Sequence, residues 1–221
     1  NIPADILQKI NLLNRYDALI AIHFPKNLQE YERALQRLKF EELFLAQVRL
    51  GMIRGKRHRR SKGVIFEKVG ALFNSFYNNY LPFELTNAQK RVIKEIRTDT
   101  AKAHQMNRLL QGDVGSGKTI VALLVMLIAA DNGYQSCMMA PTEILAQQHY
   151  NNLNFFLKDL PAGIALLTGS TKQAERRLIL EGLKNGSIHI LTGTHAVIEE
   201  VVKFNNLGLV VIDEKHRFGL A

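Results

Sequence analysis

The sequence predicts an α/β protein with a parallel β-sheet, preceded by a small and mainly helical region. Short runs rich in β-forming residues alternate with helical stretches in the second part of the chain, whereas the first part shows helical periodicity only. The β-rich runs cover residues 108–111, 135–140, 164–168, 188–192 and 207–212. The helical stretches between them cover residues 118–132, 143–157, 171–185 and, in a shorter form, 194–202. Such alternation indicates parallel strands with helices on both faces, and ligands then bind at the carboxyl ends of the strands.

The helical first region is expected to end near residue 80. Asn27 can cap a helix, and apolar residues follow it at a spacing of three to four residues. A second helical stretch comes later, and Pro82 then disfavours a helical conformation at Leu81. We therefore expect two domains, a helical linker over residues 1–80 and a larger domain over residues 81–221.

Composition favours a soluble globular protein of the cytoplasm. The chain has 221 residues, of which 47% are hydrophobic and 22% are charged. Its longest apolar run, from Ile120 to Ala130, is shorter than the roughly 20 residues that a membrane-spanning helix needs. The single cysteine, Cys137, excludes both a disulfide within the chain and a zinc site built from several cysteines.

The positive charge of the protein is concentrated in its first half. The formal net charge is +9, and residues 1–104 hold 19 basic and 10 acidic side chains, whereas residues 105–221 hold 10 of each. Six cations follow one another without an acid at Arg54, Lys56, Arg57, Arg59, Arg60 and Lys62. This basic segment is equally compatible with contact to a nucleic-acid phosphate backbone and with a solvated helix end.

A glycine-rich segment carries the strongest functional signal. It reads G-x-x-x-x-G-K-T from Gly112 to Thr119 and stands between a predicted strand and a predicted helix. Glycines let successive backbone N–H groups turn toward phosphates, and the following helix presents its positive end to them. Lys118 adds a full charge near the β- and γ-phosphates, and the Thr119 hydroxyl can bind Mg²⁺. We expect ATP to be held by Gly112, Gly115, Ser116, Gly117, Lys118 and Thr119.

Two adjacent acids at the end of the last β-rich run complete the predicted site. The apolar run of residues 207–212 leads directly into Asp213 and Glu214. At the end of a neighbouring strand, Asp213 would hold Mg²⁺, and Glu214 would orient and polarise the attacking water. We therefore expect Lys118, Asp213 and Glu214 to be the catalytic residues.

The motifs resemble those of superfamily 2 helicases. Residues 213–216 have the D-E-x-H form of their motif II, and residues 140–149, APTEILAQQH, resemble their motif Ia. The strings MNRLLQ at 106–111, TGTHA at 192–196 and RFG at 217–219 are similar to the RecG branch in particular. The resemblance extends upstream to IHFP at 22–25 and RLKFEEL at 37–43, so it spans nearly the whole chain. One departure is Lys215, which stands where this branch is expected to have glutamine.

The resemblance implies further roles. Residues 81–221 would form the first RecA-like P-loop NTPase lobe, and residues 1–80 would form a linker. Gln89 would sense the adenine base, and His216 would couple the nucleotide site to a second lobe. Five further histidines are interpreted as surface or core residues: His23, His58, His104, His149 and His189. Hydroxyls and N–H groups after three predicted strands, at 141–142, 168–170 and 193–195, suit phosphate contacts, although ordinary turns and helix caps explain them equally well.

The same resemblance implies an ATP-dependent DNA helicase or translocase that uses Mg²⁺ and remodels branched or double-stranded DNA. A second RecA-like lobe and a wedge domain of the same full-length protein would be its partners. Because arginines of the second lobe would stabilise the transferring phosphoryl group, we expect the 221-residue chain alone to be inactive. Two alternatives stay open: a translocase similar to transcription-repair coupling factor, and a regulatory nucleotide-binding module that does not hydrolyse ATP.

Overall fold

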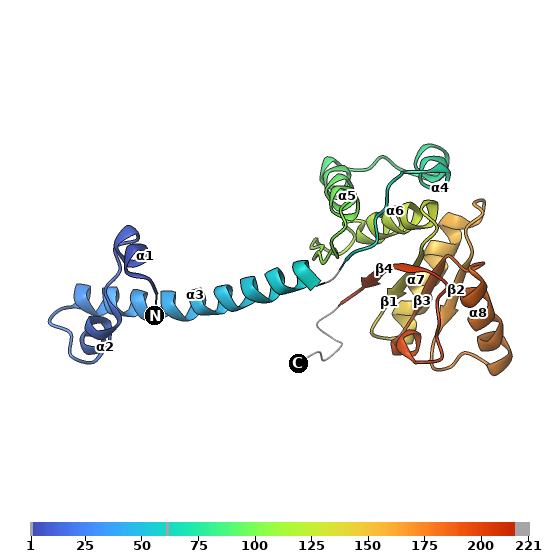
Figure 1. Ribbon diagram of the computed structural model, residues 1–221. Coiled ribbons are helices and arrows are strands. Elements are labelled where there is room, and N and C mark those ends of the chain that lie inside the picture. Colours follow the sequence, from blue (N-terminus) through green and yellow to red (C-terminus); the bar gives the residue numbers. More distant parts are fainter. Residues whose placement is uncertain (1, 61, 215–221) are drawn as a thin grey trace. The chain divides into compact units, whose positions relative to one another are not determined.

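The computed structural model describes residues 2–60 and 62–214 and divides the chain into two compact units (Figure 1). The first unit is Asn1–Ser61 and the second is Lys62–Ala221. Residues 62–80 thus belong to the second compact unit, although the sequence places a domain boundary near residue 80. The division of the protein into functional domains at that residue stays a prediction.

The first unit is helical. Its helices are α1 (Ala4–Lys9), α2 (Arg15–His23) and α3 (Leu28–Arg60). The predicted cap is confirmed, because the backbone N–H of Glu30 donates to Asn27 Oδ1 at 2.9 Å. Small residues of α2 and α3, with Ala18 and Ala34 fully buried, let the two helices pack closely.

A buried ion pair lies in the first half of α3. The side chain of Arg37 is 1% exposed, and its guanidinium contacts the Glu41 carboxylate at 2.6 Å, one helical turn later. Its Nε donates to the backbone carbonyl of Leu13 at 2.8 Å, ahead of α2. A buried charge needs such partners to offset its lost hydration. Both charged residues belong to the RLKFEEL string on which the sequence resemblance rests.

The second unit is built on a four-stranded parallel sheet in the order β2-β3-β1-β4. The strands are β1 (Gln135–Met139), β2 (Ile164–Leu167), β3 (Ile190–Gly193) and β4 (Leu207–Ile212). All four coincide with predicted β-rich runs. At the edge of this sheet, β4 exposes Leu207, Val210 and Ile212.

Helices cover both faces of this sheet, which confirms the predicted α/β class. They are α6 (Lys118–Asp131), α7 (Glu143–Leu157), α8 (Gln173–Asn185) and the short 3₁₀ helix η2 (His195–Ile198). Helix α5 (Asn87–Thr100) packs on α6. Alternate residues of a strand point to opposite faces. Accordingly, Met138 packs in a cluster with α6 and α7, whereas its neighbours Cys137 and Met139 pack with α8 and η2.

Helix α6 lies at the centre of the core. Nine of its residues are buried, including Leu123, Leu124, Met126 and Leu127, which are fully inaccessible. A helix that is apolar all round belongs inside a domain. Within the described residues, no helix is both long enough and apolar enough to cross a membrane.

Residues 62–80 are fastened to the end of α6. They include α4 (Ala71–Ser75) and the π-helical turn η1 (Phe76–Tyr80), and Phe76 is fully buried in the core. The Asp131 carboxylate accepts backbone N–H bonds from Gly70, Leu72 and Phe73 at 2.9–3.0 Å. A carboxylate at these positions satisfies the N–H groups that the first turn of a helix leaves without partners.

The structure corrects one predicted strand. Residues 108–111 form no strand, and none of β1–β4 pairs with them. The side chain of Arg108 instead bonds to α5, contacting Asp99 at 2.6 Å and Glu95 at 2.7 Å. Hydrogen bonds that the guanidinium donates to Asp99, and then to Glu95, raise the pKa of Arg108 above its usual value. Because a strand forms only when it pairs with a neighbouring strand, the apolar composition of residues 108–111 was not enough to predict one.

Candidate nucleotide site

Glycines allow the loop before α6 to take its shape. Gly115 and Gly117 have φ angles of +79° and +78°, which residues with a Cβ rarely adopt. At Gly112, an added Cβ would lie 2.6 Å from the Ser116 hydroxyl oxygen. The two glycine positions of the predicted motif, Gly112 and Gly117, and the additional Gly115 therefore need glycine for a structural reason.

Lys118 is folded back over this loop. Its ammonium group donates to the backbone carbonyls of Gly112 and Asp113, at 2.8 Å each. It is the first residue of α6, and Thr119 follows it, so both lie where the N–H groups of the helix have no intrahelical acceptor. An anion placed here meets an ammonium group and the positive end of a helix together.

Gln89 is brought against the same loop. Its side-chain amide donates to the Ser116 carbonyl at 2.9 Å, and its carbonyl oxygen accepts the backbone N–H of Thr86 at 2.8 Å. Thr86 in turn caps α5 in a reciprocal capping box with Gln89. Gly117 also lies against this amide, because a Cβ at Gly117 would collide with it. The role in adenine recognition stays a prediction.

Asp213 and Glu214 follow β4 directly, at the carboxyl end of the sheet. The backbone N–H of Asp213 continues the strand pairing by donating to the Met139 carbonyl at 2.9 Å. The N–H of Glu214 donates to Asp213 Oδ1 at 3.0 Å. Glu214 has a φ of +46°, an uncommon left-handed conformation for a residue other than glycine. Such strained positions are concentrated at functional sites.

The structure adds His149, which the sequence analysis assigned to the surface or core without a role. Its Nε2 lies 2.8 Å from Asp213 Oδ2, and its side chain is 12% exposed. Asp213 is therefore contacted through both carboxylate oxygens. A sequence signal existed, since His149 belongs to the helix that starts at a strand end, but nothing local pointed to a partner 64 residues away.

The predicted residues thus form two groups. Gln89 and Lys118 bond to the loop that holds the glycines and Ser116, whereas Asp213 contacts His149 and the backbone of Glu214. Between the residues that the structure describes, no hydrogen bond or ion pair joins Lys118 or Thr119 to Asp213. Lys215 and His216 lie outside the described residues.

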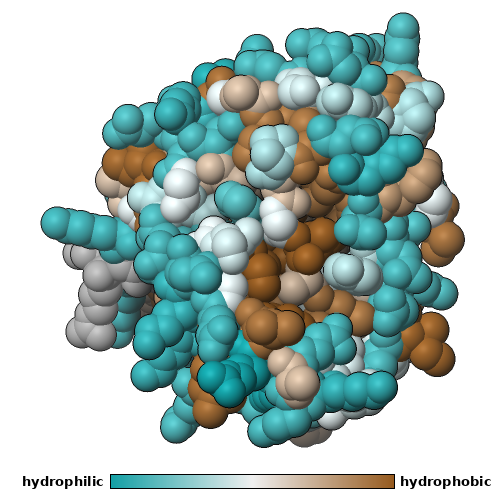
Figure 2. Space-filling view, turned by 90° about the vertical axis from the view of Figure 1, so that its right-hand side faces the viewer, coloured by the Kyte–Doolittle hydropathy of each residue, from teal (hydrophilic) through white to brown (hydrophobic). Residues whose placement is uncertain are grey.

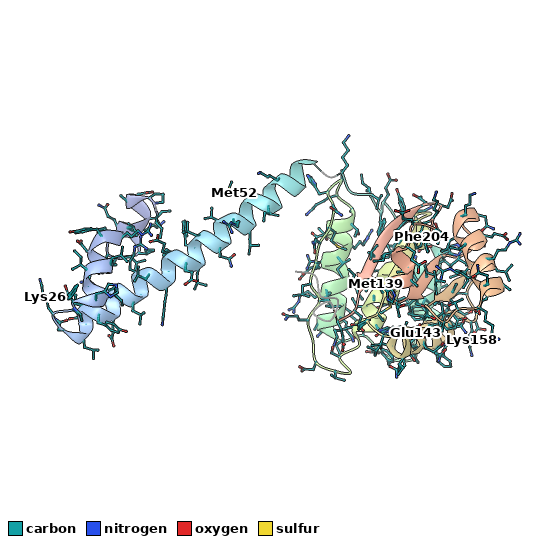
Figure 3. All side chains as sticks on the ribbon, turned by 90° about the horizontal axis from the view of Figure 1, so that it is seen from below. Lys26, Met52, Met139, Glu143, Lys158 and Phe204 are labelled. Carbon is teal, nitrogen blue, oxygen red and sulfur yellow. The ribbon has the colours of Figure 1, made fainter. Side chains whose placement is uncertain are left out.

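The loops after β1, β2 and β3 lie along the same edge of the sheet. Thr142 caps α7 by accepting the N–H of Leu145 at 3.3 Å. Glu143, labelled in Figure 3 near Met139 at the end of β1, reaches the next loop and accepts the Ser170 hydroxyl at 2.8 Å and its N–H at 3.2 Å. Thr194, after β3, is 2% exposed. The three predicted segments thus form one strand-end rim, and its contact with phosphates stays a prediction.

The two groups fit Mg²⁺ and a nucleotide triphosphate. The Lys118 ammonium group donates to the carbonyls of Gly112 and Asp113. Charged phosphate oxygens are stronger acceptors and can replace these carbonyls. Mg²⁺ is commonly bound by one or two protein side chains together with phosphate oxygens and water. The Thr119 hydroxyl and the Asp213 carboxylate are suitable ligands of this kind. In the described part of the chain, no group of three or more His, Cys, Asp or Glu side chains could hold a metal ion.

A separate groove of about 530 Å³ lies on α8, away from this site. Figure 2 shows hydrophilic residues around a central group of hydrophobic ones on the face toward which α8 lies. Two of its cations are already paired, Arg176 with Glu199 at 2.5 Å and Arg177 with Glu181 at 3.2 Å. We therefore assign no ligand to this groove.

Comparison with known proteins identifies a helicase family and related helicases. The family model of the DEAD/DEAH box helicase matches residues 86–220. The ATP-dependent DNA helicase RecG of Streptococcus pneumoniae is 48% identical over 100% of this chain, and that of Thermotoga maritima is 48% identical over 99%. This chain spans 32% and 28% of the lengths of those two relatives.

A solved structure of RecG bound to a three-way DNA junction is similar along nearly the whole chain. The TM-score is 0.87 at 46% sequence identity, and the match covers 99% of this chain and 30% of that one. The fold is therefore that of a RecA-like helicase lobe, and the predicted resemblance to the RecG branch is confirmed. By the family model, which matches more than half of its residues, the chain belongs to the DEAD/DEAH box helicase family.

Proposed function

We propose that this chain is the nucleotide-binding lobe and preceding linker of an ATP-dependent DNA helicase or translocase that remodels branched DNA, such as stalled forks and Holliday junctions. The observation that carries the proposal is that the side chains of Gln89 and Lys118 both bond to backbone carbonyls of one glycine-rich loop, within a chain 48% identical to a RecG helicase. The structure of a relative on a three-way DNA junction supports the choice of substrate. DNA substrates and an unpaired cysteine suit a cytoplasmic protein.

The chain's own residues would bind and orient the nucleotide. Lys118 exchanges its carbonyl partners for β- and γ-phosphate oxygens, and the N-terminus of α6 adds its N–H groups. Thr119 and Asp213 would hold Mg²⁺, which when bound neutralises charge that develops on the phosphates. Glu214, beside Asp213, would orient the attacking water and accept its proton.

Other parts of a longer protein would complete the catalytic site. A second RecA-like lobe would supply arginines against the transferring phosphoryl group, a contribution of about 10³- to 10⁵-fold in GTPases that use such arginines. A wedge domain would engage the junction arms. On this proposal, the 221-residue chain binds nucleotide weakly and turns it over negligibly.

Phosphate release from the short chain and from the full-length protein, each with and without branched DNA, tests this function. We expect DNA-stimulated turnover only in the full-length protein, and suppression of hydrolysis without loss of ATP binding in Glu214→Gln. Lys118→Ala should abolish binding, whereas Lys172→Ala, which removes an exposed lysine at the start of α8, should not. Equal turnover by the short and full-length proteins would refute the proposal that a second lobe completes the catalytic site. Binding without DNA-stimulated turnover in either protein would favour a regulatory module.

A further inference from the structure

Both carboxylate oxygens of Asp213 have a defined partner in the structure. The Glu214 N–H donates to Oδ1 at 3.0 Å, and His149 Nε2 lies 2.8 Å from Oδ2. The first contact comes from the adjacent residue, so by itself it leaves the side chain free to turn with its own backbone. The second comes from a different element, α7, and therefore fixes the carboxylate relative to the rest of the domain.

Helix α7 holds His149 firmly in place. Ala146, one turn earlier, is fully buried, and so is Leu153, one turn later. Residues three and four apart lie on one face of a helix, so His149 lies between two positions that are anchored against the sheet. The helix is also fixed at its start, where Thr142 caps it. The imidazole thus has little freedom to follow Asp213 if the carboxylate moves.

The direction of the hydrogen bond follows from the surroundings of the ring. An ionised carboxylate only accepts, so Nε2 carries the proton in this contact. The other ring nitrogen, Nδ1, is buried and has no hydrogen-bond partner among the described residues. Among the described residues, the ring is thus held through Nε2 alone.

We propose that His149 is a positioning residue that orients Asp213 for Mg²⁺ in the nucleotide complex. By holding Oδ2, it limits the carboxylate to one orientation before the metal arrives. Partners of this kind commonly change metal affinity by about 10- to 100-fold when they are removed. The inference rests on the proposed function, because it assigns His149 a role in that same site. The competing explanation is that His149 only attaches α7 to the end of β4.

Calorimetric titration of the chain with ADP, in EDTA and in Mg²⁺, separates the two explanations. The quantity of interest is the gain in ADP affinity that Mg²⁺ provides. We expect His149→Ala to lower this gain by about tenfold or more while leaving metal-free ADP affinity unchanged. His149→Gln places an amide N–H at the position of Nε2 and should restore most of the gain. His149→Asn carries the same amide on a shorter side chain and should not.

Controls make each outcome decisive. Asn152→Ala changes an exposed residue on the same helix and should behave as wild type. Unchanged Mg²⁺ dependence in all three His149 variants would overturn the inference. An equal loss of ADP affinity with and without Mg²⁺ would also overturn it, because a purely structural contact affects both conditions alike. Urea unfolding of each variant measures such a loss of stability independently. If wild type binds no ADP even without metal, the proposed nucleotide site itself is wrong, and the inference falls with it.

Discussion

The side-chain amide of Gln89 donates to the backbone carbonyl of Ser116 at 2.9 Å, which ties the first turn of α5 to the phosphate loop. The same side chain closes the capping box of α5 through Thr86. An amide nitrogen has a second N–H and an amide oxygen a second lone pair. Gln89 can therefore hold the loop and still offer a donor and an acceptor to an adenine edge.

Gln89→Glu should separate these roles. Glutamate keeps the oxygen that accepts the Thr86 N–H, so stability should change little, but it loses the donor to Ser116 and adds a negative charge near the phosphates. We expect ADP affinity to fall by about tenfold, whereas Gln89→Ala should also cost about 1 kcal/mol of folding stability. Titrations with ADP and GDP test adenine recognition. An equal loss of affinity for ADP and GDP would mean that Gln89 supports the loop and does not recognise adenine. Thr98→Ala, at the other end of α5, is the control.

Asp131→Ala should loosen residues 62–80. The substitution leaves the N–H groups of Gly70, Leu72 and Phe73 without their acceptor. Because bonds to charged groups are the stronger kind, we expect a loss of about 3 kcal/mol in urea unfolding. Limited proteolysis should then cut within 62–80 before the sheet is attacked. Asp159→Ala removes an exposed acid and should be neutral. If both variants resist cleavage equally, Asp131 does not anchor this segment.

The basic segment should control the salt dependence of DNA binding. The structure describes the backbone of Arg57, Arg59 and Arg60 but not their side chains, so this prediction rests on sequence. Replacing the three by glutamine should reduce the slope of log affinity against log salt by about 0.9 for each DNA phosphate that the protein no longer neutralises. The matched control replaces Arg176 and Arg177, which are already paired with acids. A slope unchanged by the triple substitution would instead assign DNA binding to the strand-end rim.

Cys137 should be inert in the folded protein. Burial within β1 raises the pKa of its thiol to about 12, from an ordinary value of 9.0. Between about pH 9 and pH 12, the folded state therefore keeps the thiol proton that the unfolded chain loses. Stability from this thiol is fully present below about pH 9 and is lost as the pH rises toward 12. Thiol-reactive dye should label it rapidly only in urea, and Cys137→Ala should flatten the decline of unfolding free energy between pH 9 and 11. Rapid labelling of native protein at pH 8 would contradict this burial.

Local patterns were sufficient for most of the fold. The apolar runs at β1–β4 were recognisable because these strands contribute side chains to the core on both faces of the sheet. Helix α7 has its predicted bounds, 143–157. The glycine-rich loop could be singled out because the positive φ angles of Gly115 and Gly117 are a local backbone requirement, and its role in binding phosphates stays a prediction. At residues 194–202, by contrast, the expected helix shortens to the 3₁₀ turn η2, His195–Ile198.

Non-local contacts explain what the sequence analysis missed. Residues 108–111 have the composition of a strand, yet Leu109 is 75% exposed and Arg108 bonds to α5. Pairing partners, not composition, decide whether such a run becomes a strand. His149 was missed for the same reason, since its partner Asp213 comes from another strand end. Its place on the buried face of α7, between Ala146 and Leu153, was the available clue.

The burial of α6 has a consequence for how the protein can respond to nucleotide. A helix packed on all sides cannot slide without opening cavities among its neighbours, so it keeps its place whether or not phosphates are bound. Its central amides should exchange with solvent deuterium only when the whole second unit unfolds. Nucleotide should instead slow exchange in the loop of residues 112–117 and at the start of α7. Helix α6 would thus stay in place when phosphates bind, and the conformational response would occur in the surrounding loops.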